Sequence, residues 1–256
     1  MDRTYYRLIG NNLDRRKGIM VACLCIHGFT GSPSEVKPLA DYLREHTDWD
    51  VLAPTLPGHD HLRHLKNVTY KDWIVFVDSI LSQMLKEDDE VYIIGFSMGG
   101  LLAGWLARHY PEVKKLVLLS TAVNAMEWPQ LVENSKQVLT EAKEVTLKNS
   151  PMFKRYQKKV TETPWTSTLQ FKKMVALAKP VFEHIEIPTF IAQGSADQVV
   201  PAEKSVNFLM ESIPGPKELF ILEGSKHVIC QDEQADKLFA AVLTFLQKDV
   251  AVLNAQ

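Results

Sequence analysis

Short, mostly apolar runs alternate along the chain with longer stretches in which apolar and polar residues recur at helical spacing. The runs occupy residues 20–26, 50–53, 90–95, 113–120, 188–193 and 217–223. Apolar runs of this length are typical of strands that are buried on both faces of a parallel sheet. The pattern therefore predicts a strand at each of these places.

Two helices are predicted from capping signals near the start of the chain. Residues 32–35 read Ser-Pro-Ser-Glu, a capping box with proline at the first helical position, so a helix is expected to begin there. Thr69 and Asp72 have the same spacing and predict the start of a second helix.

Three more helices follow from the later part of the sequence. One is expected from about residue 97 to 110, before Pro111, and another is opened by Pro201. Residues 232–247 form an amphipathic run that should close the fold, with Asp232 as its cap. Strands that alternate with helices in this way predict an α/β fold, with a mainly parallel sheet and helices on both faces.

Residues 122–184 break the alternation. They contain no convincing strand, are rich in lysine and glutamate, and carry scattered aromatic side chains. We expect a small helical cap, or lid, inserted into an α/β core that residues 1–121 and 185–256 form. Trp128 and Trp165 are candidates to line a substrate site, and packing within the cap itself is the alternative for both.

A Gly-x-Ser-x-Gly motif occupies residues 95–99, where a predicted strand gives way to a predicted helix. Chance alone would supply only about 0.03 such matches in this chain. A serine on this sharp turn is held out above the sheet edge, at a helix N-terminus that favours a developing oxyanion. Ser97 is therefore the candidate nucleophile, with a plain helix-capping serine as the alternative.

A serine hydroxyl needs a base to activate it, and in this arrangement the acid and then the histidine follow the serine in the chain. The histidines after Ser97 are His109, His184 and His227. His109 lies far along the helix that Ser97 begins, and His184 precedes a strand. His227 follows the last predicted strand, on the same sheet edge as the serine, and is the candidate base.

The acid is expected in the loop after the preceding strand, where it would hold the histidine tautomer. Asp197 occupies that loop. Glu203 and Asp232 are the rivals, but Glu203 is predicted inside a helix and Asp232 has a capping role.

Two backbone N–H groups are expected to form an oxyanion hole. One belongs to Met98, directly after the nucleophile, and the other to Phe29, in the loop after the first long strand. Gly28 and Gly31 would permit the unusual backbone of that loop, and His27 is expected to brace it.

These motifs together resemble the bacterial carboxylesterase and monoacylglycerol lipase group of the α/β-hydrolase superfamily. The resemblance is carried by residues 27–31, 95–100, the Asp197 loop and 224–228, and it covers nearly the whole chain except the cap. It implies the α/β-hydrolase fold with a helical lid and a triad of Ser97, Asp197 and His227. It also implies hydrolysis of carboxylic esters with short to medium acyl chains, without a cofactor.

Two other functions remain open at this point. A carbon–carbon bond hydrolase would use the same triad on the same fold, and a non-catalytic binding protein could share the fold alone. Dehalogenation is disfavoured because it needs a carboxylate at the position of Ser97.

The composition narrows the classes of partner that the protein is expected to bind. The net charge is -2, from 29 basic and 31 acidic residues, which gives no electrostatic reason to expect nucleic acid or a membrane surface. No apolar run approaches the ~20 residues that cross a bilayer, and the start of the chain lacks a secretory pattern. We therefore expect a cytoplasmic protein without stable membrane insertion, whose partner is a small-molecule ester; its oligomeric state is not indicated.

The cysteine and histidine patterns predict neither a disulfide framework nor a metal site. The cysteines number 3, an odd count, and are expected to be buried apolar residues. His59, His61 and His64 form the only local histidine group, without the spacing of zinc ligands.

Overall fold

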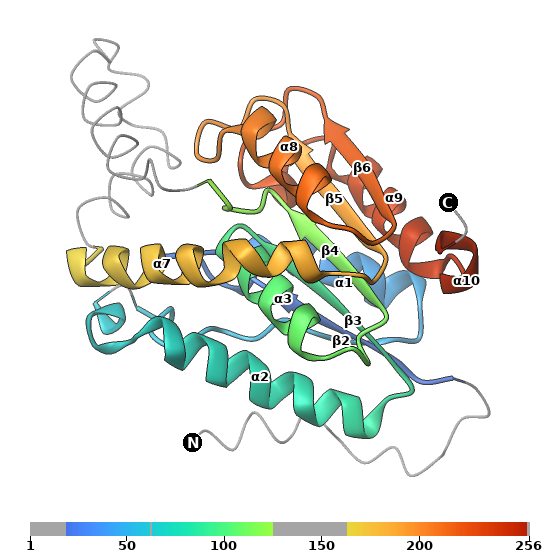
Figure 1. Cartoon of the computed structure of the whole chain (residues 1–256), viewed down its shortest axis with the longest axis horizontal. Coiled ribbons are helices and arrows are strands. Elements are labelled where there is room, and N and C mark those ends of the chain that lie inside the picture. Colours follow the sequence, from blue (N-terminus) through green and yellow to red (C-terminus); the bar gives the residue numbers. More distant parts are fainter. Residues whose placement is uncertain (1–18, 62, 125–162, 255–256) are drawn as a thin grey trace.

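A sheet of parallel strands runs through the part of the chain that the structure describes. The computed structural model describes residues 19–61, 63–124 and 163–254 (Figure 1). The sheet has six strands in the order β2-β1-β3-β4-β5-β6, and every neighbouring pair is parallel. The strands are β1 (Val21–Ile26), β2 (Asp50–Leu52), β3 (Glu90–Phe96), β4 (Lys115–Leu119), β5 (Thr189–Gly194) and β6 (Lys217–Leu222). The predicted strands are therefore confirmed, with ends within two residues of the predicted ones.

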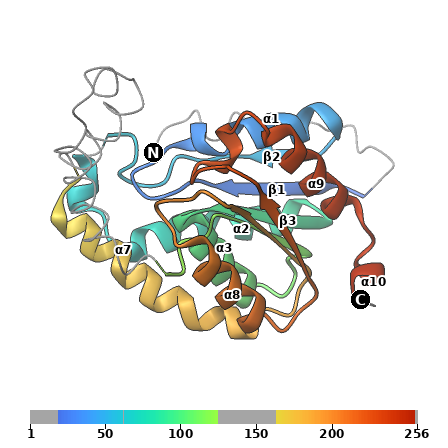
Figure 2. The same cartoon turned by 90° about the horizontal axis from the view of Figure 1, so that it is seen from above.

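Helices cover both faces of this sheet, as the alternating pattern predicts (Figure 2). The α-helices are α1 (Lys37–His46), α2 (Tyr70–Glu87), α3 (Met98–His109), α7 (Trp165–Ala178), α8 (Ala202–Ser212), α9 (Ala235–Gln247) and α10 (Val250–Leu253). Short 3-10 turns are η2 (Pro33–Glu35), η3 (His64–Asn67), η5 (Lys179–His184) and η6 (Ile229–Gln231). The α/β architecture expected from the sequence, a parallel sheet with helices on both faces, is the one observed.

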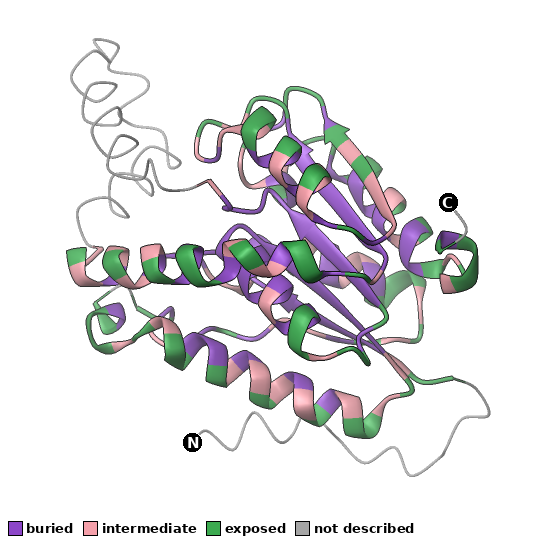
Figure 3. Cartoon of the chain, in the orientation of Figure 1, coloured by how far each residue is buried: buried purple, intermediate pink, exposed green. Residues whose placement is uncertain are grey.

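Alternate residues of the four inner strands, β1, β3, β4 and β5, pack into two separate cores. Leu24 packs into the core that α2, α3, α7 and α8 cover, whereas Cys23 and Cys25 face the core under α1 and α9. The inner strands are buried along their length (Figure 3). The cysteines are buried and free, as the sequence predicts. Within the described ranges, no helix is both long and apolar enough to cross a membrane.

The start of α2 is as predicted. The Thr69 hydroxyl accepts a hydrogen bond from the Asp72 amide (3.4 Å), and the Asp72 carboxylate accepts one from the Thr69 amide (2.7 Å). This reciprocal pair satisfies two amides that a helix start leaves without partners.

The capping box predicted at residues 32–35 is wrong. The Ser32 hydroxyl bonds to the Ser34 hydroxyl instead of a helix amide, and the segment forms the 3-10 turn η2. The α-helix α1 begins only at Lys37. The reason is that the buried Glu35 carboxylate accepts a hydrogen bond from the Gly28 amide (3.1 Å), so this side chain does not reach back to the turn at Ser32.

The predicted cap at Asp232 is also wrong. The final long helix, α9, has Gln234 at its N-cap, and Asp232 lies two residues earlier, after η6. Its carboxylate accepts a hydrogen bond from the Gln234 amide (2.9 Å), which is a local turn and not a helix cap.

Part of the predicted cap packs onto the core. Phe171 and Met174 of α7 and Phe182 of η5 are buried in the core that α3 also lines. The bounds of a cap at 122–184 stay a prediction, because residues 125–162, with Trp128, lie outside the described residues.

Asp88 and Asp72, at the two ends of α2, are expected to change the stability of the fold in opposite directions as the pH rises. Burial, and then the charges of Asp50, Glu87 and Asp89, raise the pKa of Asp88 from 3.8 to about 6. An acid whose pKa is raised by folding binds its proton more tightly in the folded protein, so it lowers stability progressively as the pH rises from about 4 to about 6. Asp88→Asn should therefore raise the melting temperature at pH 8 and leave it nearly unchanged near pH 3.5.

Asp72 is the matched comparison at the other end of α2. Hydrogen bonds from the Thr69 hydroxyl and amide lower the pKa of Asp72 in the folded protein. The ionised carboxylate therefore stabilises the fold at pH values above the unfolded pKa of 3.8, and this stabilisation is lost as the pH falls through the folded pKa. Asp72→Asn should lower the melting temperature at pH 8. Calorimetry of both variants at the two pH values tests the pair, and shifts of the same sign at pH 8 would contradict it.

Candidate active site

Ser97 lies between β3 and α3 in a backbone conformation that residues with a side chain rarely adopt, with φ 55° and ψ -115°. Its amide donates to the Leu119 carbonyl (2.9 Å), and its own carbonyl accepts from the Gly100 and Ala122 amides (3.0 and 3.3 Å). These bonds hold the strained turn in place, so the hydroxyl is presented at the carboxyl edge of the sheet.

Small residues allow this turn to form. A Cβ atom on Gly95 would lie 2.3 Å from the Gly99 carbonyl oxygen, and one on Gly99 would lie 2.1 Å from the Ile26 carbonyl oxygen. Both obstacles are backbone atoms, which cannot rotate away. The first turn of α3 can therefore approach the ends of β1 and β3 only because glycine occupies both positions.

Strained backbone is concentrated at one edge of the sheet. Among the described residues, the non-glycine residues with positive φ are Thr30, Ser97 and Ser120, at 57°, 55° and 44°. They follow the carboxyl ends of β1, β3 and β4, which are neighbours in the sheet. Such residues cost about 1–3 kcal/mol each and are often found at functional sites.

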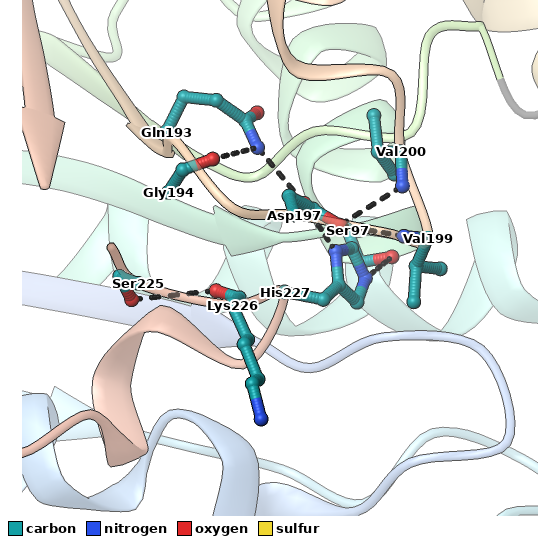
Figure 4. A network of polar contacts seen from close by, with 9 residues as sticks. All are labelled: Ser97, Gln193, Gly194, Asp197, Val199, Val200, Ser225, Lys226 and His227. Carbon is teal, nitrogen blue, oxygen red and sulfur yellow. Dashed lines mark hydrogen bonds and ion pairs between the residues drawn. The ribbon is translucent and has the colours of Figure 1, made fainter. Parts of the chain in front are cut away.

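A chain of hydrogen bonds links Ser97, His227 and Asp197 (Figure 4). The Ser97 Oγ lies 3.0 Å from His227 Nε2, and His227 Nδ1 lies 2.7 Å from Asp197 Oδ2. A carboxylate only accepts, so Nδ1 carries the hydrogen in this chain and Nε2 is the acceptor for the serine hydroxyl. The structure thus brings together the three residues that the chain order selects.

The Ser97 side chain does not cap its own helix. Although Ser97 occupies the N-cap position of α3, its hydroxyl forms no cap hydrogen bond and is directed to His227 instead. The alternative of a plain helix-capping serine is therefore not what the structure contains.

Asp197 is held as an anion in a buried place. Its side chain has no exposed surface, and burial by itself would raise its pKa. The hydrogen bond and charge of His227, and then the amides of Val200 and Val199, outweigh burial and lower the pKa of Asp197. Those two amides both bind Oδ1, at 3.0 and 2.8 Å.

The loops that carry Asp197 and His227 are joined by their backbones. The Ala196 amide donates to the Ser225 carbonyl (3.0 Å), and the Gly224 amide donates to the Ser195 hydroxyl (2.8 Å). A Cβ atom on Gly194 would lie 2.4 Å from the Ser225 carbonyl oxygen. The loops that carry Asp197 and His227 are therefore held together mainly by main-chain contacts, with one hydrogen bond to the Ser195 side chain.

The rival residues lie elsewhere. His109 and His184 are exposed at the ends of α3 and η5, where they line a surface hollow. Glu203 is exposed in the first turn of α8, and Asp232 forms the local turn described above. Since both ring nitrogens of His227 are occupied by Ser97 and Asp197, neither rival acid partners this histidine.

The loop after β1 passes directly beside Ser97. A Cβ atom on Gly28 would lie 3.1 Å from the Ser97 Cβ. The Gly31 amide donates to the Gly28 carbonyl (3.2 Å), which closes a turn around Phe29. Phe29 and Met98, the predicted oxyanion donors, therefore flank the serine, one in this turn and one in the first turn of α3.

Aromatic side chains fix this loop. The Phe29 ring stacks on Phe171 of α7, with ring centroids 4.9 Å apart, and meets Trp73 of α2 edge-on at 5.9 Å. His27 braces the loop as predicted, because its Nε2 accepts the Leu56 amide (3.1 Å) and its Nδ1 donates to the Gly28 carbonyl (2.9 Å). This pair of bonds defines a neutral His27 ring.

Trp165 is the first residue of α7 and is 76% exposed. Trp128 lies outside the described residues. Contact of either tryptophan with a substrate stays a prediction.

Two residues near the site were not found by sequence reasoning. Glu35 was assigned to a helix cap, but its carboxylate lies against the Gly28–Gly31 turn. Gln193 donates a hydrogen bond to Asp197 (2.8 Å), and its only sequence signal is a polar residue at the end of a buried strand. In the described ranges, no group of three or more His, Cys, Asp or Glu residues is arranged to hold a metal ion.

The close approach at Gly99 predicts a steep penalty for a side chain there. In Gly99→Ala the new methyl would meet backbone oxygen at 2.1 Å, so the turn must move. Overpacking of this kind typically costs about 1–3 kcal/mol or more, which exceeds the helix propensity that alanine gains over glycine. Urea unfolding should show a net loss of at least about 1 kcal/mol.

Gly104 provides the control in the same helix. A Cβ atom there would meet only the edge of the Phe182 ring, at 2.6 Å, and a side chain can shift where a backbone carbonyl cannot. Gly104→Ala should therefore lose less stability than Gly99→Ala. The reverse order would contradict the role given to the backbone contact.

Known proteins are similar to this chain along most of its length. A thermostable monoacylglycerol lipase from a Bacillus species is 27% identical over 239 residues, which cover 89% of this chain and 91% of that protein. A carboxylesterase from Bacillus subtilis is 25% identical over 234 residues, or 91% of this chain and 94% of that protein.

Solved structures share the fold. A structure reported for the metagenome-derived lipolytic enzymes LipS and LipT superimposes with a TM-score of 0.74 at 24% identity, over 91% of this chain and 95% of that chain. The family model described as alpha/beta hydrolase fold matches residues 22–156, which is more than half of the chain. The chain therefore belongs to the alpha/beta hydrolase fold family.

Proposed function

We propose that the protein is a serine hydrolase that cleaves carboxylic esters through an acyl-Ser97 intermediate. The observation that carries this proposal is the hydrogen-bonded chain from Ser97 Oγ to His227 Nε2 (3.0 Å) and from His227 Nδ1 to Asp197 Oδ2 (2.7 Å). A nucleophile, a base and a group that orients the base are the parts that acyl transfer requires.

In the first half of the reaction, Ser97 Oγ attacks the ester carbonyl carbon while its proton passes to His227 Nε2. The imidazolium that forms is stabilised by Asp197, which is already ionised and buried. When the tetrahedral intermediate collapses, the bond to the alcohol oxygen breaks, and Nε2 returns the proton to that oxygen. The alcohol leaves, and the acyl group stays on Ser97.

In the second half, water takes the place of the alcohol. His227 Nε2 accepts a proton from the water as its oxygen attacks the acyl carbon, and the proton then returns to Ser97 Oγ as the carboxylic acid leaves. A ring that already carries a proton on Nε2 cannot accept another. The rate is therefore expected to fall on the acid side of the pH profile.

The oxyanion of each tetrahedral intermediate needs hydrogen-bond donors. We assign this role to the Phe29 and Met98 amides, which flank Ser97 from the loop after β1 and from the first turn of α3. The N-terminus of α3 adds partial positive charge at the same place. Loss of one such donor typically costs about 2.7–4 kcal/mol of transition-state stabilisation.

The names of the relatives support a class of substrate. The two Bacillus proteins are named a monoacylglycerol lipase and a carboxylesterase, and each aligns over most of this chain. We propose small-molecule esters with short to medium acyl chains as substrates, with Trp128 and Trp165 at the acyl site and the segment 122–184 as its cap.

Ser97→Ala should abolish hydrolysis of p-nitrophenyl butyrate without changing the free energy of unfolding by more than about 1 kcal/mol. Asp197→Asn should lower kcat by about 10³–10⁴-fold, because an amide can hold the wrong tautomer of the base. Glu203→Gln and Asp232→Asn, which remove the rival acids, serve as matched controls and should keep the parent rate. Steady-state assays decide, and an active Ser97→Ala variant would refute the mechanism.

The acyl site can be probed with p-nitrophenyl esters from acetate to palmitate. If Trp165 lines that site, Trp165→Ala should shift the preferred chain length, whereas Trp105→Ala in α3 should not. An unchanged preference would leave Trp165 as an ordinary surface residue. A vinylogous diketone assayed alongside tests the carbon–carbon bond hydrolase alternative, and its cleavage in preference to every ester would overturn the ester assignment.

A further inference from the structure

The Asp197 carboxylate receives more hydrogen bonds than the proposed mechanism uses. Oδ1 accepts the amides of Val199 and Val200, and Oδ2 accepts His227 Nδ1. A fourth donor, the side-chain Nε2 of Gln193, lies 2.8 Å from the same Oδ2 that receives His227 (Figure 4). The oxygen that orients the base is therefore shared between two side chains.

The identity of the fourth donor follows from chemistry. An ionised carboxylate only accepts hydrogen bonds, so the amide of Gln193 must present its NH₂ group to Oδ2. Gln193 is 2% exposed and the Asp197 side chain is fully buried, so solvent does not compete for this contact. A hydrogen bond to a buried charged group is among the stronger ones in proteins.

Gln193 is also held rigidly. It belongs to β5, where it pairs with Ile221 of β6, so its backbone is fixed by the sheet on which the Asp197 loop is mounted. The loop bonds bind Oδ1 from one side, and Gln193 binds Oδ2 from the strand. Rotation of the carboxylate away from His227 would break bonds at both oxygens.

We propose that Gln193 is a positioning residue of the active site, whose amide orients Asp197 Oδ2 toward His227 and withdraws part of its negative charge. This inference rests on the proposed function of Ser97, His227 and Asp197. The donor is uncharged, so it stabilises the anion without adding a positive charge next to the base. With less charge on Oδ2, the ring of His227 releases its proton more readily and is available as a base at lower pH.

The surroundings of His227 make this effect measurable. Asp197 is the anion in contact with the ring, and the neighbouring Lys226 is exposed and directs its amine away from it (Figure 4). Phe96, whose ring centroid lies 5.0 Å from that of His227, adds no charge. A change at Gln193 should therefore reach the ring through Asp197.

The test compares three variants. Gln193→Met keeps the length of the side chain but cannot donate, and Gln193→Glu replaces the amide with an ionisable group of the same shape. Thr189→Val is the matched control, because Thr189 is a buried polar residue of the same strand, about 13 Å away, whose hydroxyl donates to the Ile187 carbonyl (3.0 Å).

Hydrolysis of p-nitrophenyl butyrate is measured against pH. The acid-side midpoint of kcat/KM should move to higher pH in Gln193→Met, because Oδ2 loses a donor. It should stay closer to the parent value in Gln193→Glu, because a carboxyl group buried 2.8 Å from the Asp197 carboxylate keeps its proton and still donates to Oδ2. The step to methionine should be about half a pH unit, and kcat at pH 7 should fall about tenfold with KM within twofold. Thr189→Val should keep the parent midpoint.

A packing defect would lower activity without producing this order, so identical midpoints in all variants would overturn the proposal. If Gln193→Met fails to fold, Gln193→Leu, which also lacks a donor, takes its place. The titration midpoint of the His227 ring, followed by NMR in the resting protein, should show the same order and needs no turnover. If the parent hydrolyses no ester, the proposed function fails, whereas the NMR order alone still decides the role of Gln193.

Discussion

Contact between main chains, without side chains in between, is the constraint on which this structure depends. The first turn of α3 lies against the Ile26 carbonyl because residue 99 is glycine, and the acid and base loops touch at Gly194 for the same reason. Main-chain atoms cannot change rotamer, so contacts of this kind fix distances more firmly than packed side chains do. Ser97, His227 and Asp197 come from three separate segments, and main-chain contacts help to hold these segments together.

Two buried polar side chains near the site, those of Asp197 and His27, have hydrogen-bond partners. Asp197 is fully buried, and each of its oxygens receives two hydrogen bonds. The ring of His27 is buried with both nitrogens engaged. Buried groups that are satisfied in this way rigidify their surroundings, whereas partly satisfied ones are destabilising. The aromatic stack from Phe29 to Phe171 adds the same restraint in apolar form, so that α7 supports the loop beside Ser97.

The sequence was sufficient to predict the sheet, the turn at Ser97 and the residues that meet there. Strands buried on both faces leave a strong local signal, and a parallel sheet brings loops far apart in the chain to one edge, which is why chain order pointed to Asp197 and His227. The predictions that failed concern side chains whose hydrogen-bond partners local spacing did not identify. Glu35 has the spacing of a capping box, but its carboxylate binds the Gly28 amide instead, and Gln193 has only the local pattern of the end of an apolar strand. Such choices depend on tertiary contacts that local spacing does not encode.

The three strained residues at the ends of β1, β3 and β4 have a consequence for how the protein can change. Strain is free energy that the rest of the fold has to offset, and here it is confined to one edge of the sheet. Selection for heat tolerance alone would relax that edge first, at the expense of reactivity. Stability can be gained without this conflict at the opposite, amino-terminal edge. Stabilising substitutions are therefore expected to accumulate more readily at that end of the strands than at the carboxyl end.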